Sequence, residues 1–195
     1  MADRTAPSDL TGHLLIAMPG MSDPRFAGSV VFLCAHSPDG AMGLIVNRPI
    51  PDLTFAEMLD QLDVEADGAP SLPVCFGGPV ETNRGFVLHG DDYKPKGKIS
   101  GEGFVAVGSG FAMSSTLDIL DALAKGSGPA QALVMLGYAG WGPQQLEAEI
   151  ALNGWLTAAT GPDLVFGPDM DAKWEAALAS LGVDPLLLST QAGRA

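Results

Sequence analysis

The sequence predicts one mixed α/β domain, α+β in its layout, with a bent or barrel-like β-sheet covered by about four helices. The length of 195 residues and a hydrophobic content of 47% suffice for a single core. The 25 glycines and 15 prolines indicate many turns. Short apolar runs alternate with helical stripes, which favours a mixed sheet. We expect a flexible tail over 1–9, the domain over 10–190 and a second tail over 191–195.

Three apolar runs near the start of the chain predict a meander of buried strands. They are Leu14–Met18, Ser29–Ala35 and Met42–Val46, and Pro38-Asp39-Gly40 forms a turn before the third.

The first helix is expected from Thr54, because Thr54 and Glu57 have the spacing of a capping box. Leu53 and Met58 have the spacing of a hydrophobic staple. One apolar stripe follows, made of Phe55, Met58, Leu59 and Leu62. The stripe indicates packing on the sheet.

The middle of the chain predicts short strands and a β-α-β unit. The strand candidates are Val74–Phe76, Phe86–His89, Phe104–Val107 and Ala132–Leu136. Before the last of these, Ser114 or Ser115 caps a second helix that ends near Gly126. Its inward side chains are expected to be Leu117, Leu120 and Leu123.

Two more helices are expected near the end of the chain. Pro143 begins the third, whose core-facing residues are Leu146, Ile150 and either Trp155 or Leu156. The fourth runs from Asp171 to Leu181, with its stripe on Trp174, Ala177, Leu178 and Leu181.

Charge and composition limit the partners and the compartment. The chain has 10 basic and 23 acidic residues, a formal charge of −13, which opposes direct binding of nucleic acid. The alternating Lys94, Lys96 and Lys98 are interpreted as a solvated edge. Without a secretion signal or a membrane-spanning run, the protein is expected in the cytoplasm, with no membrane partner. Cys34 and Cys75 are interpreted as reduced core thiols.

The segment Gly137–Gly142 is the first candidate site, because it places Tyr138 and Trp141 among glycines directly before a helix that contains Gln145. The two aromatic side chains could stack on a planar ligand or anchor a partner. They could equally seal a buried corner between strand and helix.

A second set of residues suggests an anion site. Asn47 and Arg48 offer donors at the end of a strand, and Gly77 and Gly78 could bring backbone amides close to a carboxylate or phosphate. The alternatives are an Asn turn with an internally paired Arg48, and a tight turn at the glycines. Together with the helix start at Pro143, the set predicts a small anionic ligand.

Histidine chemistry gives the alternative function, a hydrolase-like enzyme that uses His36 or His89 with a nearby carboxylate. A Cys34–His36 nucleophile pair is disfavoured by its spacing on a strand. His89 with Asp91 and Asp92 lacks further ligands at diagnostic spacing, so no metal site is predicted. Gly108-Ser109-Gly110 lacks the third glycine and the acidic residue of a dinucleotide loop, so no cofactor is predicted either.

The motifs together resemble the YqgE/AlgH family of bacterial proteins along nearly the whole chain. They are Leu14–Pro19, Gly40–Pro49, Gly77–Val80, Leu88-His89 and Gly137–Gly142. The resemblance implies a compact α/β fold with a barrel-like sheet and cytosolic residence, without an established catalytic mechanism. One branch of the family is labelled a transcriptional regulator of exopolysaccharide production. This chain has Ala35 where the family often has an acidic residue before His36, which weakens an acid–base role for that histidine.

From the residues and the resemblance we expect a non-catalytic protein that binds a small anionic ligand or a regulatory protein partner. A role in transcription would then be indirect, through another protein, because the charge of the chain opposes DNA contact.

Overall fold

The computed structural model describes residues 9–66, 68–94, 103–108 and 110–188. The predicted tails, apart from Asp9, lie outside these ranges, as do Lys96, Lys98 and Ser109. Within these ranges, no helix is both long enough and apolar enough to cross a membrane.

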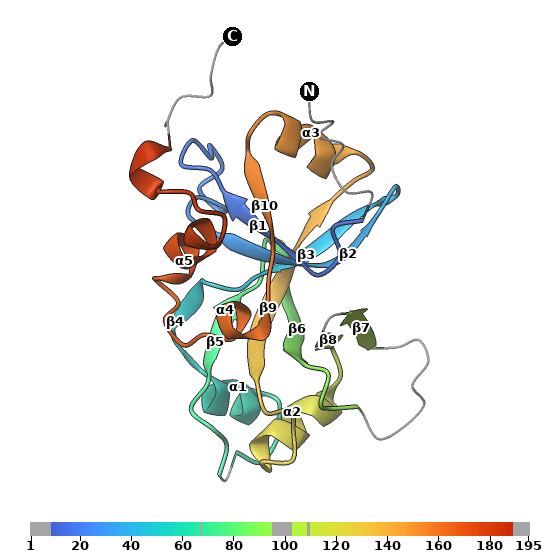
Figure 1. Cartoon of the computed structure of the whole chain (residues 1–195). Helices are drawn as coiled ribbons and strands as arrows, with labels where there is room; N and C mark the ends of the chain where they lie inside the picture. Colours follow the sequence, from blue (N-terminus) through green and yellow to red (C-terminus); the bar gives the residue numbers. More distant parts are fainter. Residues whose placement is uncertain (1–8, 67, 95–102, 109, 189–195) are drawn as a thin grey trace.

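The upper part of the molecule is an antiparallel layer in the strand order β10-β1-β2-β3-β9 (Figure 1). Its strands are β1 (His13–Ala17), β2 (Val30–Ser37), β3 (Gly40–Ile45), β9 (Ala132–Trp141) and β10 (Trp155–Ala159). The predicted meander is confirmed, because β1, β2 and β3 pair in sequence order.

The lower part continues from the same long strand in the order β9-β6-β8-β7, with β5 and β4 on the other edge of β9. These strands are β4 (Pro49–Thr54), β5 (Pro73–Phe76), β6 (Val80–Gly90), β7 (Phe104–Gly108) and β8 (Phe111–Ser114). β5 and β9 form the one parallel pair among the described strands, so the predicted mixed sheet is confirmed.

The connection from β5 to β6 passes from one edge of β9 to the other. β5 pairs with one edge of β9, and Val80 at the start of β6 already pairs with Tyr138 on the other edge. Only residues 77–79 make this passage, so the two backbones must touch. A Cβ atom on Gly77 would overlap the carbonyl oxygen of Gly137, and one on Gly78 would overlap the backbone of Tyr138. Glycine is therefore required at both positions, because the two backbones lie too close together for a side chain.

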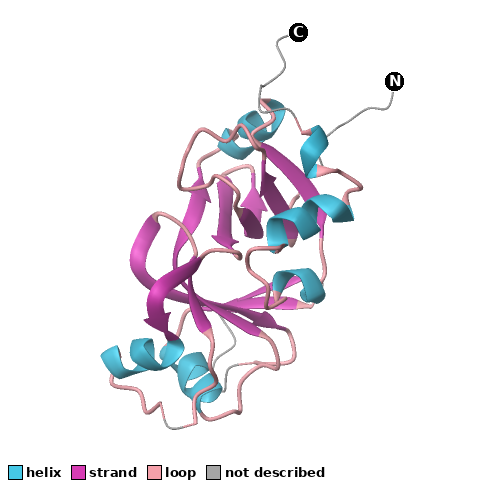
Figure 2. Cartoon of the chain, turned by 90° about the vertical axis from the view of Figure 1, so that its left-hand side faces the viewer, coloured by secondary structure: helices cyan, strands magenta, loops and turns pink. Residues whose placement is uncertain are grey.

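The curled sheet encloses one apolar cluster and packs helices on its outer faces (Figure 2). The inner cluster, which includes Phe32, Phe111 and Met135, is closed by α4 (Pro162–Val165) and α5 (Lys173–Ser180). A second cluster lies under α3 (Gln145–Ala151), and a third lies under α1 (Phe55–Gln61) and α2 (Leu117–Ala124). A final 3₁₀ turn, η1, spans Pro185–Leu187.

The first helix begins as predicted. The Thr54 hydroxyl accepts from the Glu57 amide at 3.2 Å, and the Glu57 carboxylate accepts from the Thr54 amide at 2.8 Å. Leu62 lies beyond the helix end and is 43% exposed, so its place in the predicted apolar stripe is wrong.

Thr116, rather than either predicted serine, occupies the N-cap position of the second helix, without a capping hydrogen bond from its side chain, and Ser114 is the last residue of β8. Leu120 and Leu123 are buried as predicted, but Leu117 is 59% exposed because it occupies the first position of the helix.

The C-terminal third contains two further corrections. α3 begins at Gln145, not at Pro143, and Trp155 and Leu156 belong to β10 rather than to this helix, because Asn153 and Gly154 end it. Leu181 is 40% exposed, contrary to the predicted stripe, since it is the C-cap residue of α5. The short α4 was not predicted.

Candidate functional site

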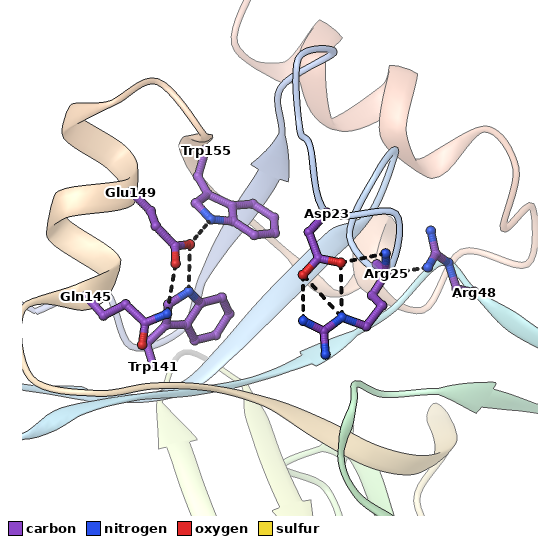
Figure 3. A network of polar contacts seen from close by, with 7 residues as sticks. All are labelled: Asp23, Arg25, Arg48, Trp141, Gln145, Glu149 and Trp155. Atoms are coloured by element: carbon purple, nitrogen blue, oxygen red, sulfur yellow. Dashed lines mark hydrogen bonds and ion pairs between the residues drawn. The ribbon is translucent and has the colours of Figure 1, made fainter.

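A cavity of about 660 Å³ lies between the β1–β2 loop, the end of β9, α3 and the start of β10. Its wall combines apolar side chains with a small number of polar groups, which is the usual character of a ligand site. Its lining includes Asp23, Arg25, Phe26, Trp141, Gln145, Glu149 and Trp155, all of which except Phe26 are shown as sticks in Figure 3.

Three aromatic rings form the apolar wall. Trp141 and Trp155 are buried, with their ring centroids 6.0 Å apart at an interplanar angle of 80°. Phe26 packs edge-on against Trp155 at 5.7 Å and lies 6.3 Å from Trp141. Because the rings are tilted against one another, the cluster offers an angled apolar corner to a ligand.

The carboxylate of Glu149 fixes both indoles (Figure 3). Its Oε2 accepts from Trp141 Nε1 at 3.0 Å and from Trp155 Nε1 at 2.8 Å. Its Oε1 accepts from Gln145 Nε2 at 2.9 Å, and Gln145 Oε1 accepts from the Gly142 amide at 3.0 Å. Since the carboxylate is charged and accepts three donors, the wall is held rigidly before any ligand arrives. Sequence reasoning missed Glu149, although its position four residues after Gln145 placed it on the same helical face.

The opposite wall carries an ion pair. Asp23 accepts from Arg25 Nη2 at 2.7 Å and from Arg25 Nε at 3.0 Å. The hydrogen bonds to Arg25 hold the pKa of Asp23 below its usual value. The Nη1 group of Arg25 has no hydrogen-bond acceptor among the described residues. Sequence reasoning missed this pair as well.

Asn47 and Arg48 hold that wall in place and do not line the cavity. The guanidinium of Arg48 donates to the carbonyl oxygens of Arg25 and Ala27. Asn47 accepts from the Val30 amide at 2.8 Å and donates to the Gly28 carbonyl at 3.0 Å. Arg48 is therefore neither paired with an acid nor directed at a ligand in this arrangement.

Of the predicted site residues, only Trp141 and Gln145 lie on the cavity wall. Tyr138 points to the other face of β9, where it packs against Phe86 with ring centroids 5.8 Å apart. Gly77 donates its amide to the Leu136 carbonyl at 2.8 Å and, like Gly78, lies against β9. The predicted convergence of all these residues on one anion is not what the structure shows.

His36 does have the nearby carboxylate that the hydrolase alternative requires. Its Nε2 lies 2.9 Å from Glu147 Oε1, while its Nδ1 accepts from the Leu10 amide at 3.0 Å. Both ring nitrogens are thus occupied, and the imidazole has none left to activate a nucleophile. The buried Cys34 thiol donates to the Phe32 carbonyl, and burial raises its pKa to about 12. This thiol is not a nucleophile at neutral pH.

His89 is fully buried beside a hydroxyl rather than a carboxylate. Its Nδ1 donates to the Gly90 carbonyl at 2.7 Å, and its Nε2 accepts from Ser114 Oγ at 2.9 Å. Ser114 is itself fully buried, so this Ser–His pair has no access to substrate. Asp92 instead accepts from the Ala130 amide at 2.9 Å.

No group of three or more metal-binding side chains is assembled in the part of the chain that the structure describes. Both cysteines are buried and free, and burial raises the pKa of Cys75 to about 11. Lys173, close to Cys75, donates to the carbonyls of Val46 at 2.9 Å and Val165 at 2.7 Å. Burial lowers its pKa to about 8.

Known proteins resemble this chain in sequence and in structure. An AlgH-like family model matches residues 14–186. Proteins named UPF0301 from Jannaschia sp. strain CCS1 and Ruegeria pomeroyi are both 59% identical, over 96% of this chain and 96% and 100% of their own length. The solution structure of the AlgH protein from Pseudomonas aeruginosa is 43% identical, with a TM-score of 0.73 over 98% of this chain and 99% of that one. A crystal structure from Corynebacterium diphtheriae, 19% identical over 95% of this chain and 92% of that one, shares the fold with a TM-score of 0.68. This chain therefore belongs to the AlgH-like family.

Proposed function

We propose that this protein is a non-catalytic binding protein whose small ligand enters the cavity between the β1–β2 loop and α3. The observation that carries the proposal is the pair of buried indoles held by one carboxylate. Fixed aromatic walls reduce the entropy lost on binding, because they need no ordering when the ligand arrives.

The arrangement of the polar groups favours binding over catalysis. Glu149 accepts three hydrogen bonds and Asp23 is held by Arg25, so neither carboxylate is free to act as a base. A general base or nucleophile must reach the reacting atom with an unoccupied acceptor or donor.

The ligand has an apolar body and a single acidic group. The body would lie against Trp141, Trp155 and Phe26, and a carboxylate or sulfonate would accept from Nη1 of Arg25. Asp23 and Glu149 outnumber Arg25 at the wall, so a multiply charged anion such as a nucleotide would be repelled. We therefore keep the expectation of a small anionic ligand, but with a single negative charge. Its cationic contact is Arg25 instead of Arg48.

The role of the protein is regulatory, and the protein acts through a protein partner. Since a chain with a formal charge of −13 repels DNA, the ligand would alter what the protein binds rather than how it contacts nucleic acid. The transcriptional label of one family branch fits this indirect route.

The test uses two fluorescent probes of similar size, 8-anilinonaphthalene-1-sulfonate and the uncharged N-phenyl-1-naphthylamine. Both should bind at one site and quench the tryptophan emission of the native protein. Arg25→Gln should weaken binding of the sulfonate probe by about tenfold and leave the affinity for the uncharged probe unchanged.

The matched control is Arg84→Gln, because Arg84 forms a similarly exposed ion pair with Glu81 on another part of the surface. Phe26→Ala should weaken both probes. Failure of both probes to bind the native protein would refute the proposal.

A further inference from the structure

A second hollow lies between α1 and α2. Figure 1 shows these two helices at the lower end of the molecule. It consists of two adjoining depressions of about 320 and 110 Å³ that share Leu62, Gly85 and Leu120 in their walls. We call this the α1–α2 groove.

The floor of the groove is apolar. It is formed by Val134 and Leu136 on β9, with Met58 of α1 and Leu120 of α2 beside them. Gln61 and Asn83 add the polar part of the lining. No atom lies within 4 Å of the position that a Cβ on Gly85 would take, so the missing side chain of this glycine leaves the groove open. Leu62 and Leu117 stand at the rim with 43% and 59% of their surface exposed.

The rim beside Leu117 is acidic. A neighbouring depression is lined by Asp63, Glu65, Asp118 and Asp121, with Lys125 as its single cation. Lys125 is already paired with Asp121 at 2.7 Å, and the other three acids form no ion pair with any residue that the structure describes. An apolar floor is therefore bordered by net negative charge.

We propose that the α1–α2 groove binds a cationic amphipathic segment of a protein partner. Leucine-like side chains of the segment would fill the hollow over Gly85, and its lysines or arginines would face Asp63, Glu65 and Asp118. Amphipathic helices bind apolar grooves in this way, and opposite charges at the rim speed association and select the partner. Acidic peptides and anionic lipid surfaces would be repelled by the same rim. This site is independent of the ligand cavity.

The experiment measures the affinity of the full chain for a short amphipathic leucine–lysine peptide by fluorescence anisotropy. A peptide with glutamate in place of lysine serves as the negative probe. Gly85→Val should abolish binding while keeping the fold, because a β-branched residue suits a strand and the space over Gly85 is empty. Leu62→Gln and Leu117→Gln should each weaken binding by about tenfold, since each removes a leucine that the bound peptide would bury.

Charge is tested separately. Asp63→Asn with Asp118→Asn should flatten the dependence of affinity on salt, because rim charges act through screened attraction. The matched controls are Asp39→Asn with Glu175→Gln, which remove two charges from exposed positions elsewhere, and Leu186→Gln, which changes a leucine that is 91% exposed. These controls should bind as the native chain does.

Several outcomes would overturn the proposal. One is an unchanged affinity in Gly85→Val, and another is an equal loss in the control variants, which would indicate only diffuse attraction to an acidic chain. A native dimer that Gly85→Val dissociates in sedimentation would mean that a second copy occupies the groove. Binding of phosphatidylcholine vesicles to the native chain in the absence of peptide, lost in Gly85→Val, would mean that lipid occupies it.

Discussion

Replacing Glu149 by alanine tests the rigid wall of the ligand cavity directly. Two buried indole N–H groups, at 3.0 and 2.8 Å from one carboxylate oxygen, would lose their acceptor together. A hydrogen bond to a charged group contributes about 1.5–3 kcal/mol, and water entering through the cavity mouth would restore part of it. We therefore expect Glu149→Ala to lower the free energy of unfolding by about 3 kcal/mol, which corresponds to about 6–12 °C in Tm for a domain of this size.

The assay is urea unfolding followed by tryptophan fluorescence, with thermal unfolding by circular dichroism as a second measurement. Glu149→Gln should lie between the alanine variant and the native chain, because its amide oxygen can still accept from an indole while its NH₂ group faces another donor in Gln145. Glu175→Ala, an exposed change on α5, should cost less than about 0.5 kcal/mol. A Glu149→Ala variant as stable as this control would show that the indole hydrogen bonds do not hold the wall.

Three further predictions follow from the fold. Gly77→Ala should cost about 3 kcal/mol or more in urea unfolding, because its Cβ would overlap the β9 backbone, whereas Gly85→Ala has free space and should be nearly neutral. Burial lowers the pKa of Lys173 from 10.5 to about 8, so the unfolded chain binds more protons between these values, and the free energy of unfolding should rise with pH across that window. Lys173→Met should remove that rise. Burial also lowers the pKa of His89 below 6.5, so stability should fall as the pH drops below about 6.5; an NMR titration giving His89 a pKa at or above 6.5 would contradict this.

Local signals in the sequence predicted the parts of the fold that depend on local chemistry. The capping box at Thr54 and the meander of β1 to β3 follow from residues that are close in the chain. The exposed Leu62 and Leu117 were misplaced because they flank the ends of helices, where a periodic stripe gives no information about which residue still faces the core.

The polar groups of the cavity could not be predicted because their partners come from distant segments. Glu149 on α3 holds a tryptophan of β9 and another of β10, and Arg48 after β3 binds carbonyls in the loop that precedes β2. Arg25 lies beside Asp23 in the chain, yet nothing in that pair distinguishes it from an ordinary surface turn until the fold places it opposite the indoles.

The glycine motifs illustrate why a distinctive pattern can indicate architecture instead of chemistry. Gly77, Gly78 and Gly137 are required where the chain passes over β9, so their pattern reflects a contact between two backbones. β9 itself runs through Gly137 and continues to Trp141. Because side chains alternate along a strand, Tyr138 and Trp141, three positions apart, must face opposite sides of it. Trp141 accordingly reaches the cavity, where its Nε1 donates to Glu149 of α3 at 3.0 Å, while Tyr138 packs against Phe86 on the other face.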